Sequence, residues 1–344
     1  MTSSIHNEVI IFSQAAGDTI HILDLYEKNR KNTKFSIYVI KNKNIYDYFN
    51  ELDLRLKNLV FIPYPKRFGL YNIQLLRKEK KRINSLFKKH FINSVNHKIY
   101  FFAHVYDYLT MSFVLSLSKN NTVIFVDYDK YDTNKTLPKQ FYHVKDKMLL
   151  TIYKYLVGKQ LVLTEKKAIK LLFENTNIKS NKTDEVSSKI KEKYSHNIAN
   201  QSTGNSVLIF ETPTAEASII NYKNTMIEIL NILVKAGYKI YIKPHPYKGF
   251  SPFLRNYNVS ICNANVPGEL INTSGFNFIF GINSLSICRL AIDRYGSIYS
   301  LIQLFTFRRL NEKDYNIKYL LGQSNEKILF INSLNHLDKI LAKR

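Results

Sequence analysis

Short apolar segments alternate with longer helix-like segments along most of this chain. In the N-terminal part, segments of strand length lie at 8–12, 35–40, 59–62, 98–103 and 122–126. Between them, apolar residues recur at helical spacing, as in 73–91 and 108–117. Parallel strands need a crossover between them, and a helix is its usual form. The alternation therefore predicts an α/β fold with mainly parallel, doubly wound sheets.

The same alternation resumes after a polar stretch near the middle of the chain. Predicted strands follow at 207–210, 239–242, 259–262, 276–280 and 328–331. The stretch before them is dominated by Asn, Ser, Thr and Lys, a composition typical of a connecting segment. A chain of 344 residues usually forms two domains. We therefore predict an N-terminal domain at 1–175, an interdomain segment at 176–206 and a C-terminal domain at 207–344.

The charge of the chain points to anionic partners. Fifty Lys and Arg residues against 27 Asp and Glu residues give a net charge of +23. One predicted helix, 73–91, carries a dense basic face made by Arg77, Lys78, Lys80, Lys81, Arg82, Lys88 and Lys89. The pattern favours docking on an anionic membrane surface, and an ordinary surface helix is the alternative. Zinc-finger spacing and aromatic RNA-binding motifs are missing, so a nucleic-acid partner is not expected.

Other features of the sequence indicate a cytoplasmic protein. No apolar run approaches the roughly 18 residues of a membrane-spanning helix. The first residues are polar and do not resemble a signal peptide. Cys262 and Cys288 are too few for a disulfide framework, which favours a reducing compartment. We expect a cytoplasmic chain that can lie peripherally at the inner face of the plasma membrane, with its oligomeric state left open.

The segment Lys243-Pro244-His245-Pro246 follows a short buried strand. Neither proline has an N–H for a sheet hydrogen bond, so the strand must end there. His245 is thereby placed on a stiff loop at the carboxyl end of a strand, where open α/β sheets bind their ligands. A structural turn with an exposed histidine is the alternative interpretation.

A second candidate lies at Asp127-Tyr128-Asp129, directly after the predicted strand 122–126. Together with Asp132 it places three carboxylates in six residues, where they raise one another's pKa values and suit general-base chemistry. Two alternatives stay open. One is a structural loop that caps a helix, and the other is an Asp-x-Asp site for Mg²⁺ or Mn²⁺ against a diphosphate.

A third candidate, Gly281-Ile282-Asn283-Ser284-Leu285-Ser286, opens a predicted helix after a strand. Glycine permits close approach of the backbone, and hydroxyl and free N–H groups at a helix N-terminus bind phosphate. A simple N-cap by Asn283 or Ser284 is the alternative. One strand earlier, Glu269 lies at a turn where its carboxylate can accept hydrogen bonds from two ribose hydroxyls. An exposed acid at the start of a helix is the alternative.

The order of these motifs resembles that of the bacterial lipooligosaccharide sialyltransferases, glycosyltransferase family 52, and related polysialyltransferases. The matching residues lie mostly within 207–295: Lys243-Pro244-His245-Pro246, Val266-Pro267-Gly268-Glu269-Leu270 and Gly281-Ile282-Asn283-Ser284-Leu285-Ser286. The resemblance implies a GT-B architecture of two Rossmann-like domains facing a cleft, with no essential metal and no cofactor. It also implies inverting transfer of sialic acid from CMP-sialic acid to a cell-surface glycan acceptor, such as lipooligosaccharide or capsule.

The resemblance also implies roles for individual residues. His245 contacts the donor phosphate and acts as general acid, Glu269 holds the ribose, and Ser284 and Ser286 bind phosphate. Lys243, Gly281 and Asn283 belong to the same substrate-binding set. The general base of these enzymes lies in an acid-acid-Gly motif, for which Asp127-Tyr128-Asp129 is the nearest equivalent here. Tyr128 replaces the second acid and Asp129 the glycine.

If the base lies elsewhere, Glu211 and Glu216 are the next candidates. Three other functions remain open on the sequence. Lys-Pro-His-Pro loops also occur in capsule and teichoic-acid polymerases, which use other nucleotide-activated donors. A metal-dependent GT-A transferase would use the Asp-x-Asp site. A non-catalytic protein that binds polyanions or membranes would use the basic helix alone.

Overall fold

The computed structural model describes residues 8–64, 73–102, 108–127, 155–156, 178–182, 188–198, 205–212, 218–246, 249–293 and 297–342. The chain divides into two compact units, Met1–Val186 and Ser187–Arg344. The division falls within the polar segment 176–206. Predictions for 128–154 and 157–177 lie outside the described residues. Cys262 and Cys288 are free and buried.

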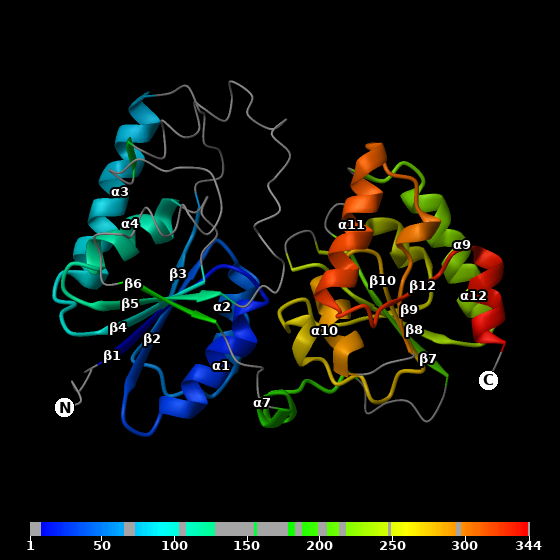
Figure 1. Cartoon of the computed structure of the whole chain (residues 1–344), viewed down its shortest axis with the longest axis horizontal. Helices are drawn as coiled ribbons and strands as arrows, with labels where there is room; N and C mark the ends of the chain where they lie inside the picture. The colour runs from blue at the N-terminus through cyan, green and yellow to red at the C-terminus, as the bar shows by residue number, and fades with distance from the viewer. Residues whose placement is uncertain are drawn as a thin grey trace. The chain divides into compact units, whose positions relative to one another are not determined.

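Unit 1 contains a six-stranded sheet in which every neighbouring pair is parallel. The strand order is β3-β2-β1-β4-β5-β6 (Figure 1). The bounds are Glu8–Ser13 for β1, Lys34–Ile40 for β2, Asn58–Ile62 for β3, Lys98–Phe101 for β4, Thr122–Asp127 for β5 and Ile178–Lys182 for β6. The first five confirm predicted strands. β6 lies in the segment predicted to join the domains, and that part of the prediction is wrong.

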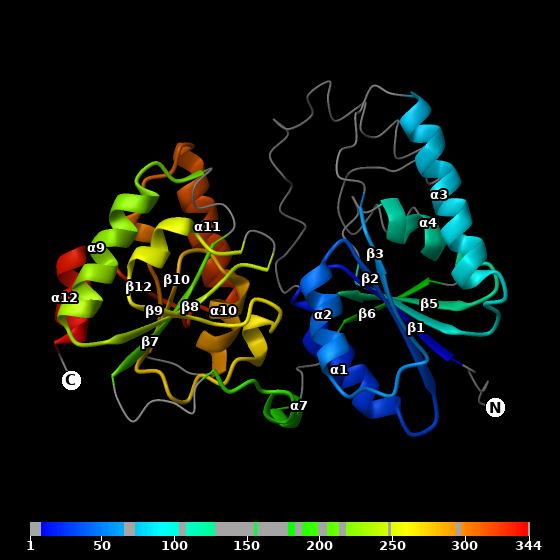
Figure 2. The same ribbon diagram turned by 180° about the vertical axis from the view of Figure 1, so that it is seen from behind.

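Helices cover both faces of this sheet. They are α1 (Asp18–Asn29), α2 (Lys43–Glu51), α3 (Ile73–Phe91) and α4 (Tyr108–Leu117). Figure 2 shows α1 and α2 on one face of the sheet, with α3 and α4 on the other. Asp18 begins α1, and its carboxylate accepts hydrogen bonds from Ser13 Oγ and the backbone N–H groups of Gln14 and Ala15. It therefore fastens the loop after β1.

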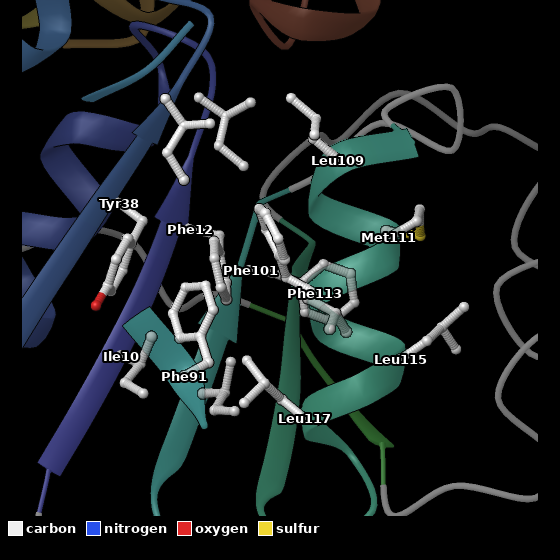
Figure 3. Close-up of a cluster of buried hydrophobic side chains, with 14 of the residues drawn as sticks. Ile10, Phe12, Tyr38, Phe91, Phe101, Leu109, Met111, Phe113, Leu115 and Leu117 are labelled. Atoms are coloured by element: carbon white, nitrogen blue, oxygen red, sulfur yellow. The ribbon is translucent and has the colours of Figure 1, made fainter. Parts of the chain in front are cut away.

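Beneath α3 and α4 lies an aromatic core (Figure 3). Phe12 of β1, Phe91 of α3 and Phe113 of α4 have ring centroids 5.3 to 6.0 Å apart and are fully buried. Pairs at this spacing add to the free energy gained by burying apolar area. The apolar side of α3 is therefore already occupied by the core, so only its other side faces solvent.

Unit 2 repeats the design with a second parallel sheet, in the order β12-β11-β10-β7-β8-β9. The strands are β7 (Ser206–Phe210), β8 (Lys239–Lys243), β9 (Val259–Ile261), β10 (Phe278–Gly281), β11 (Ile298–Ser300) and β12 (Leu329–Phe330). The helices are α7 (Ser188–Lys193), α9 (Tyr222–Lys235), α10 (Leu285–Asp293), α11 (Leu310–Gln323) and α12 (Leu334–Leu341). Among the described residues, the short 3-10 helices η2 (Pro252–Asn256), η3 (Gly268–Leu270) and η4 (Ile302–Leu304) interrupt the connections.

Counted along the chain within each unit, both sheets have the strand order 3-2-1-4-5-6. This is the order of the dinucleotide-binding Rossmann fold, whose topological switch point lies between its first and fourth strands. In unit 2 these strands are β7 and β10. The predicted fold class, two Rossmann-like domains with parallel sheets, is confirmed.

Candidate functional site

Three neighbouring strands of unit 2 end side by side at the switch point. Phe210 of β7 pairs with Lys243 of β8 on one side and with Gly281 of β10 on the other. The loops that follow these strands therefore leave the same edge of the sheet. Because neighbouring strands lie about 4.8 Å apart, the chain ends of β8 and β10 are separated by only about 10 Å.

The loops after β7 and β10 are joined across the switch point. The Thr212 hydroxyl donates a hydrogen bond to Asn283 Oδ1. Thr212 is buried and Asn283 is half-buried. Ser284 lies just before α10 and Ser286 lies in its first turn, both half-buried. This helix start carries the hydroxyl groups that are predicted to bind phosphate.

His245 lies in a closed backbone loop after β8. Its N–H donates to the carbonyl of Gly249 at 3.1 Å, and the Gly249 N–H donates back at 2.8 Å. Gly249 has a φ of +71°, a conformation that L-residues rarely adopt, so glycine suits this closure. His245 itself is half-buried. The reciprocal hydrogen bonds hold the histidine backbone in place at the carboxyl edge of the sheet.

Glu211, which directly follows β7, binds Ser251 just beyond the His245 loop. Its carboxylate accepts from the Tyr222 hydroxyl at 2.6 Å and from the N–H and hydroxyl of Ser251, each at 3.2 Å. Both carboxylate oxygens are engaged, and the side chain is buried. This arrangement suits a tether better than a proton acceptor. Glu216, the other alternative candidate for the general base, lies outside the described residues.

Glu269 enters the edge from η3 and is 7% exposed. Its Oε1 lies 3.6 Å from Arg289 Nη1 of α10. Its Oε2 is buried and has no hydrogen-bond partner among the described residues. An unsatisfied buried carboxylate oxygen is costly in free energy, so this atom is a strong candidate for contact with a ligand.

Gly268, the residue before Glu269, explains how η3 lies so close to α10. A Cβ on Gly268 would lie 2.5 Å from Ser286 Oγ and 2.7 Å from Phe210 Cε1. Only glycine fits without displacing these atoms. The turn that carries Glu269 is therefore packed directly against the first turn of α10 and the end of β7.

Lys243 is 3% exposed and joins two of the loops. Its ammonium donates to the carbonyls of Pro244 at 3.0 Å and Ala264 at 3.1 Å. Burial lowers the pKa of Lys243 from 10.5 to about 8, against opposing effects of Cys262 and Glu269. The sequence predicted that Lys243 binds substrate. The observed contacts fasten the His245 loop to the loop that leads to Glu269.

A pH titration of stability should reveal this buried ammonium. Because the folded-state pKa lies below the unfolded value, the unfolded chain binds more protons between pH 8 and 10.5. Over that window we expect the stability of the wild type to rise by about 3 kcal/mol relative to Lys243→Met. Denaturant unfolding at several pH values measures the difference, and Lys235→Met, at an exposed site, is the control. Parallel curves for the wild type and Lys243→Met would contradict the assignment.

The predicted base lies in unit 1. Asp127 is the last residue of β5, so it stands at the carboxyl edge of that sheet, as expected. Asp129 and Tyr128 lie outside the described residues. Within the part of the chain that the structure describes, no group of three or more His, Cys, Asp or Glu side chains is arranged to hold a metal ion.

Comparison with known proteins gives a structural likeness only. No protein-family model and no curated protein matches the sequence. Among solved structures, UGT89C1 of Arabidopsis thaliana complexed with UDP has a TM-score of 0.51 at 8% identity. Its complex with UDP-L-rhamnose has a TM-score of 0.50 at 8% identity. In both cases 98% of this chain and 90% of the other are covered.

A UDP-GlcNAc 2-epimerase from Neisseria meningitidis has 12% identity and a TM-score of 0.47, over 98% of this chain and 90% of that one. The likeness to UGT89C1 establishes the two-domain GT-B fold.

Proposed function

We propose that this chain is a glycosyltransferase whose nucleotide-sugar donor binds at the carboxyl edge of the unit 2 sheet. The GT-B fold supports this, because it pairs two Rossmann-like sheets, and such sheets bind nucleotides at the switch point. In unit 2 the switch point lies between β7 and β10, where the His245 loop, η3 and the start of α10 come together.

One observation carries the proposal, the half-satisfied carboxylate of Glu269. Its Oε1 faces Arg289, whereas its Oε2 is buried without a partner among the described residues. The two neighbouring hydroxyls of a ribose are hydrogen-bond donors, and a carboxylate can accept from both. A bound nucleoside would therefore satisfy the oxygen that the protein leaves unpaired.

The preferred donor is CMP-sialic acid, on the strength of the motif order His-Pro, Pro-x-Glu-Leu and Gly-x-x-Ser-x-Ser. In this proposal His245 faces the donor phosphate, and the hydroxyls of Ser284 and Ser286 bind it at the start of α10. The lipooligosaccharide or capsule acceptor implied by the same motifs remains part of this proposal.

A UDP-sugar is the second candidate donor. The structures of UGT89C1 that resemble this chain contain UDP and UDP-L-rhamnose. The carboxylate of Glu269 does not distinguish these donors, because a ribose is common to CMP and UDP. The choice between the two donors depends on how the site recognises the nucleobase and the number of phosphates.

The transfer reaction needs an acid for the leaving group and a base for the acceptor. The bond from the anomeric carbon to the phosphate oxygen breaks, and His245 donates a proton to the departing phosphate. The acceptor oxygen forms the new bond to that carbon and gives up its proton to a base, for which we propose Asp127 or Asp129. The transition state is oxocarbenium-like, so positioning and stabilisation of the leaving phosphate supply most of the catalysis.

A nucleotide screen by thermal shift tests the proposal. We expect CMP to raise the unfolding midpoint more than UDP, GDP or CDP, because only a ligand that binds the native state stabilises it. At a hundredfold excess over the dissociation constant, the gain is about 2.7 kcal/mol. A clear preference for UDP would replace CMP-sialic acid with a UDP-sugar as donor. If neither free nucleotides nor nucleotide sugars shift the midpoint, the glycosyltransferase proposal is wrong.

A further inference from the structure

The solvent-facing side of α3 combines positive charge with nearby exposed apolar side chains. Five of its basic residues are exposed: Arg77, Lys78, Lys81, Lys88 and Lys89. At 100° per residue they fall within about 120° of the helix circumference. We call these five residues the basic face. Among the described residues none of the five has an ion-pair partner, and no carboxylate shares their sector.

The one acidic residue of α3 is directed elsewhere. Glu79 is buried, pairs with Arg82 at 2.5 Å and accepts a hydrogen bond from the Tyr108 hydroxyl at 3.0 Å. The buried side of the helix belongs to the core through Ile83 and Phe91. The basic face is therefore fixed in orientation by packing, and its charge is not neutralised within the described structure.

Exposed apolar residues border this helix. Eight large apolar side chains are exposed among the described residues, and four of them lie at or beside α3: Leu75, Ile92, Val95 and Tyr155. Leu75 belongs to α3, and Ile92 and Val95 follow its last residue. Tyr155 packs under Lys80 of the helix, with the ammonium 4.5 Å from the ring centroid and bonded to the Tyr155 carbonyl at 3.0 Å.

We propose that the basic face of α3 docks this chain on the surface of an anionic lipid bilayer. Five unpaired cations match the negative headgroups. The exposed apolar residues near the helix favour a bilayer over a dissolved polyanion, which offers no apolar phase to receive them. Within the described residues, no helix combines the length and apolar character needed to cross a membrane. The proposed contact is peripheral, and it does not depend on the proposed transfer reaction.

Co-sedimentation of the full-length protein with vesicles tests the docking surface. Vesicles of phosphatidylcholine mixed with phosphatidylserine are compared with vesicles of phosphatidylcholine alone. We expect binding only to the anionic vesicles, falling steeply as salt screens the charges. Equal binding to both kinds of vesicle, or binding that salt leaves unchanged, would overturn the proposal. These vesicle measurements need only the wild-type protein.

Matched variants then locate the surface. In one variant Arg77, Lys78, Lys81, Lys88 and Lys89 are all replaced by Gln. In the control, five exposed lysines elsewhere are replaced by Gln: Lys31, Lys34, Lys223, Lys235 and Lys318. Each basic residue near an anionic surface contributes about fivefold in affinity, so replacing all five should weaken vesicle binding by about 3,000-fold. Equal losses in both variants would show that net charge acts without a defined surface.

A third variant separates a bilayer from a dissolved polyanion. Replacement of Leu75, Ile92 and Val95 by Ser should weaken vesicle binding and leave binding to a DNA duplex unchanged. If vesicle binding survives this change and the duplex binds through the basic face as tightly as vesicles do, the surface belongs to a nucleic-acid partner and the proposal is wrong.

Discussion

Replacing His245 by alanine is expected to lower the rate of sugar transfer by about 10²–10⁴, the usual contribution of a positioned general acid. His245 follows the strand end of β8, and reciprocal hydrogen bonds with Gly249 fix its backbone. The Glu211 carboxylate anchors Ser251 at the other end of the loop. Fixing the backbone reduces the reorganisation needed before the imidazole meets a departing phosphate. Initial rates with the donor that best stabilises the chain measure the effect.

A donor with a less basic leaving group separates proton donation from a general loss of structure. Such a donor needs less help from an acid, so it should recover part of the activity lost in His245→Ala. It should not rescue Asp127→Asn or Asp129→Asn, because a base acts on the acceptor. His336→Ala, in helix α12, is the control and should keep the wild-type rate. Full activity of His245→Ala would remove the histidine from the mechanism.

The sequence predicted most of the two sheets because buried parallel strands are nearly continuous apolar runs. Segments such as 207–210 and 122–126 therefore stood out from their polar surroundings. β6 was missed because its sequence, Ile-Lys-Ser-Asn-Lys, is polar. It lies at the edge of its sheet, where pairing through the backbone does not require burial of both faces.

Part of the candidate site was also predictable. Parallel strands place their carboxyl ends at one edge, so the segments after β8 and β10 had to emerge together once the sheet order was known. The contacts among the loops at this edge were not predictable. Gly268 against Ser286, Glu211 with Ser251 and Lys243 with the Ala264 carbonyl all link residues far apart in the sequence. No local pattern encodes such pairings.

The contacts of Asp18 are likewise not evident from the sequence. An aspartate at the start of a helix usually caps it by accepting a hydrogen bond from an N–H two or three residues later. In the structure, the carboxylate turns backward to the N–H groups of Gln14 and Ala15. The short loop of small residues between β1 and α1 brings those donors within reach. The sequence pattern does not reveal which N–H groups donate to the carboxylate.

The second large effect is expected at Glu269. Replacing it by alanine removes the only carboxylate that we assign to the ribose, and the loss of one hydrogen bond to a charged group costs about 1.5–3 kcal/mol. Nucleotide affinity should therefore fall by roughly 10- to 100-fold. Because the ribose contacts persist from ground state to transition state, turnover at saturating donor should change little. Glu269→Gln keeps one acceptor oxygen and should fall between the wild type and Glu269→Ala.

Calorimetric titration of the preferred nucleotide into the wild type, Glu269→Ala and Glu228→Ala tests the central claim most directly. Glu228 is an exposed carboxylate of α9 in the same unit, so its removal changes the net charge by the same amount. If the nucleotide binds at the carboxyl edge of the unit 2 sheet, only Glu269→Ala should bind it with a dissociation constant 10- to 100-fold larger than that of the wild type. Equal dissociation constants for all three proteins would place the nucleotide elsewhere and contradict the account.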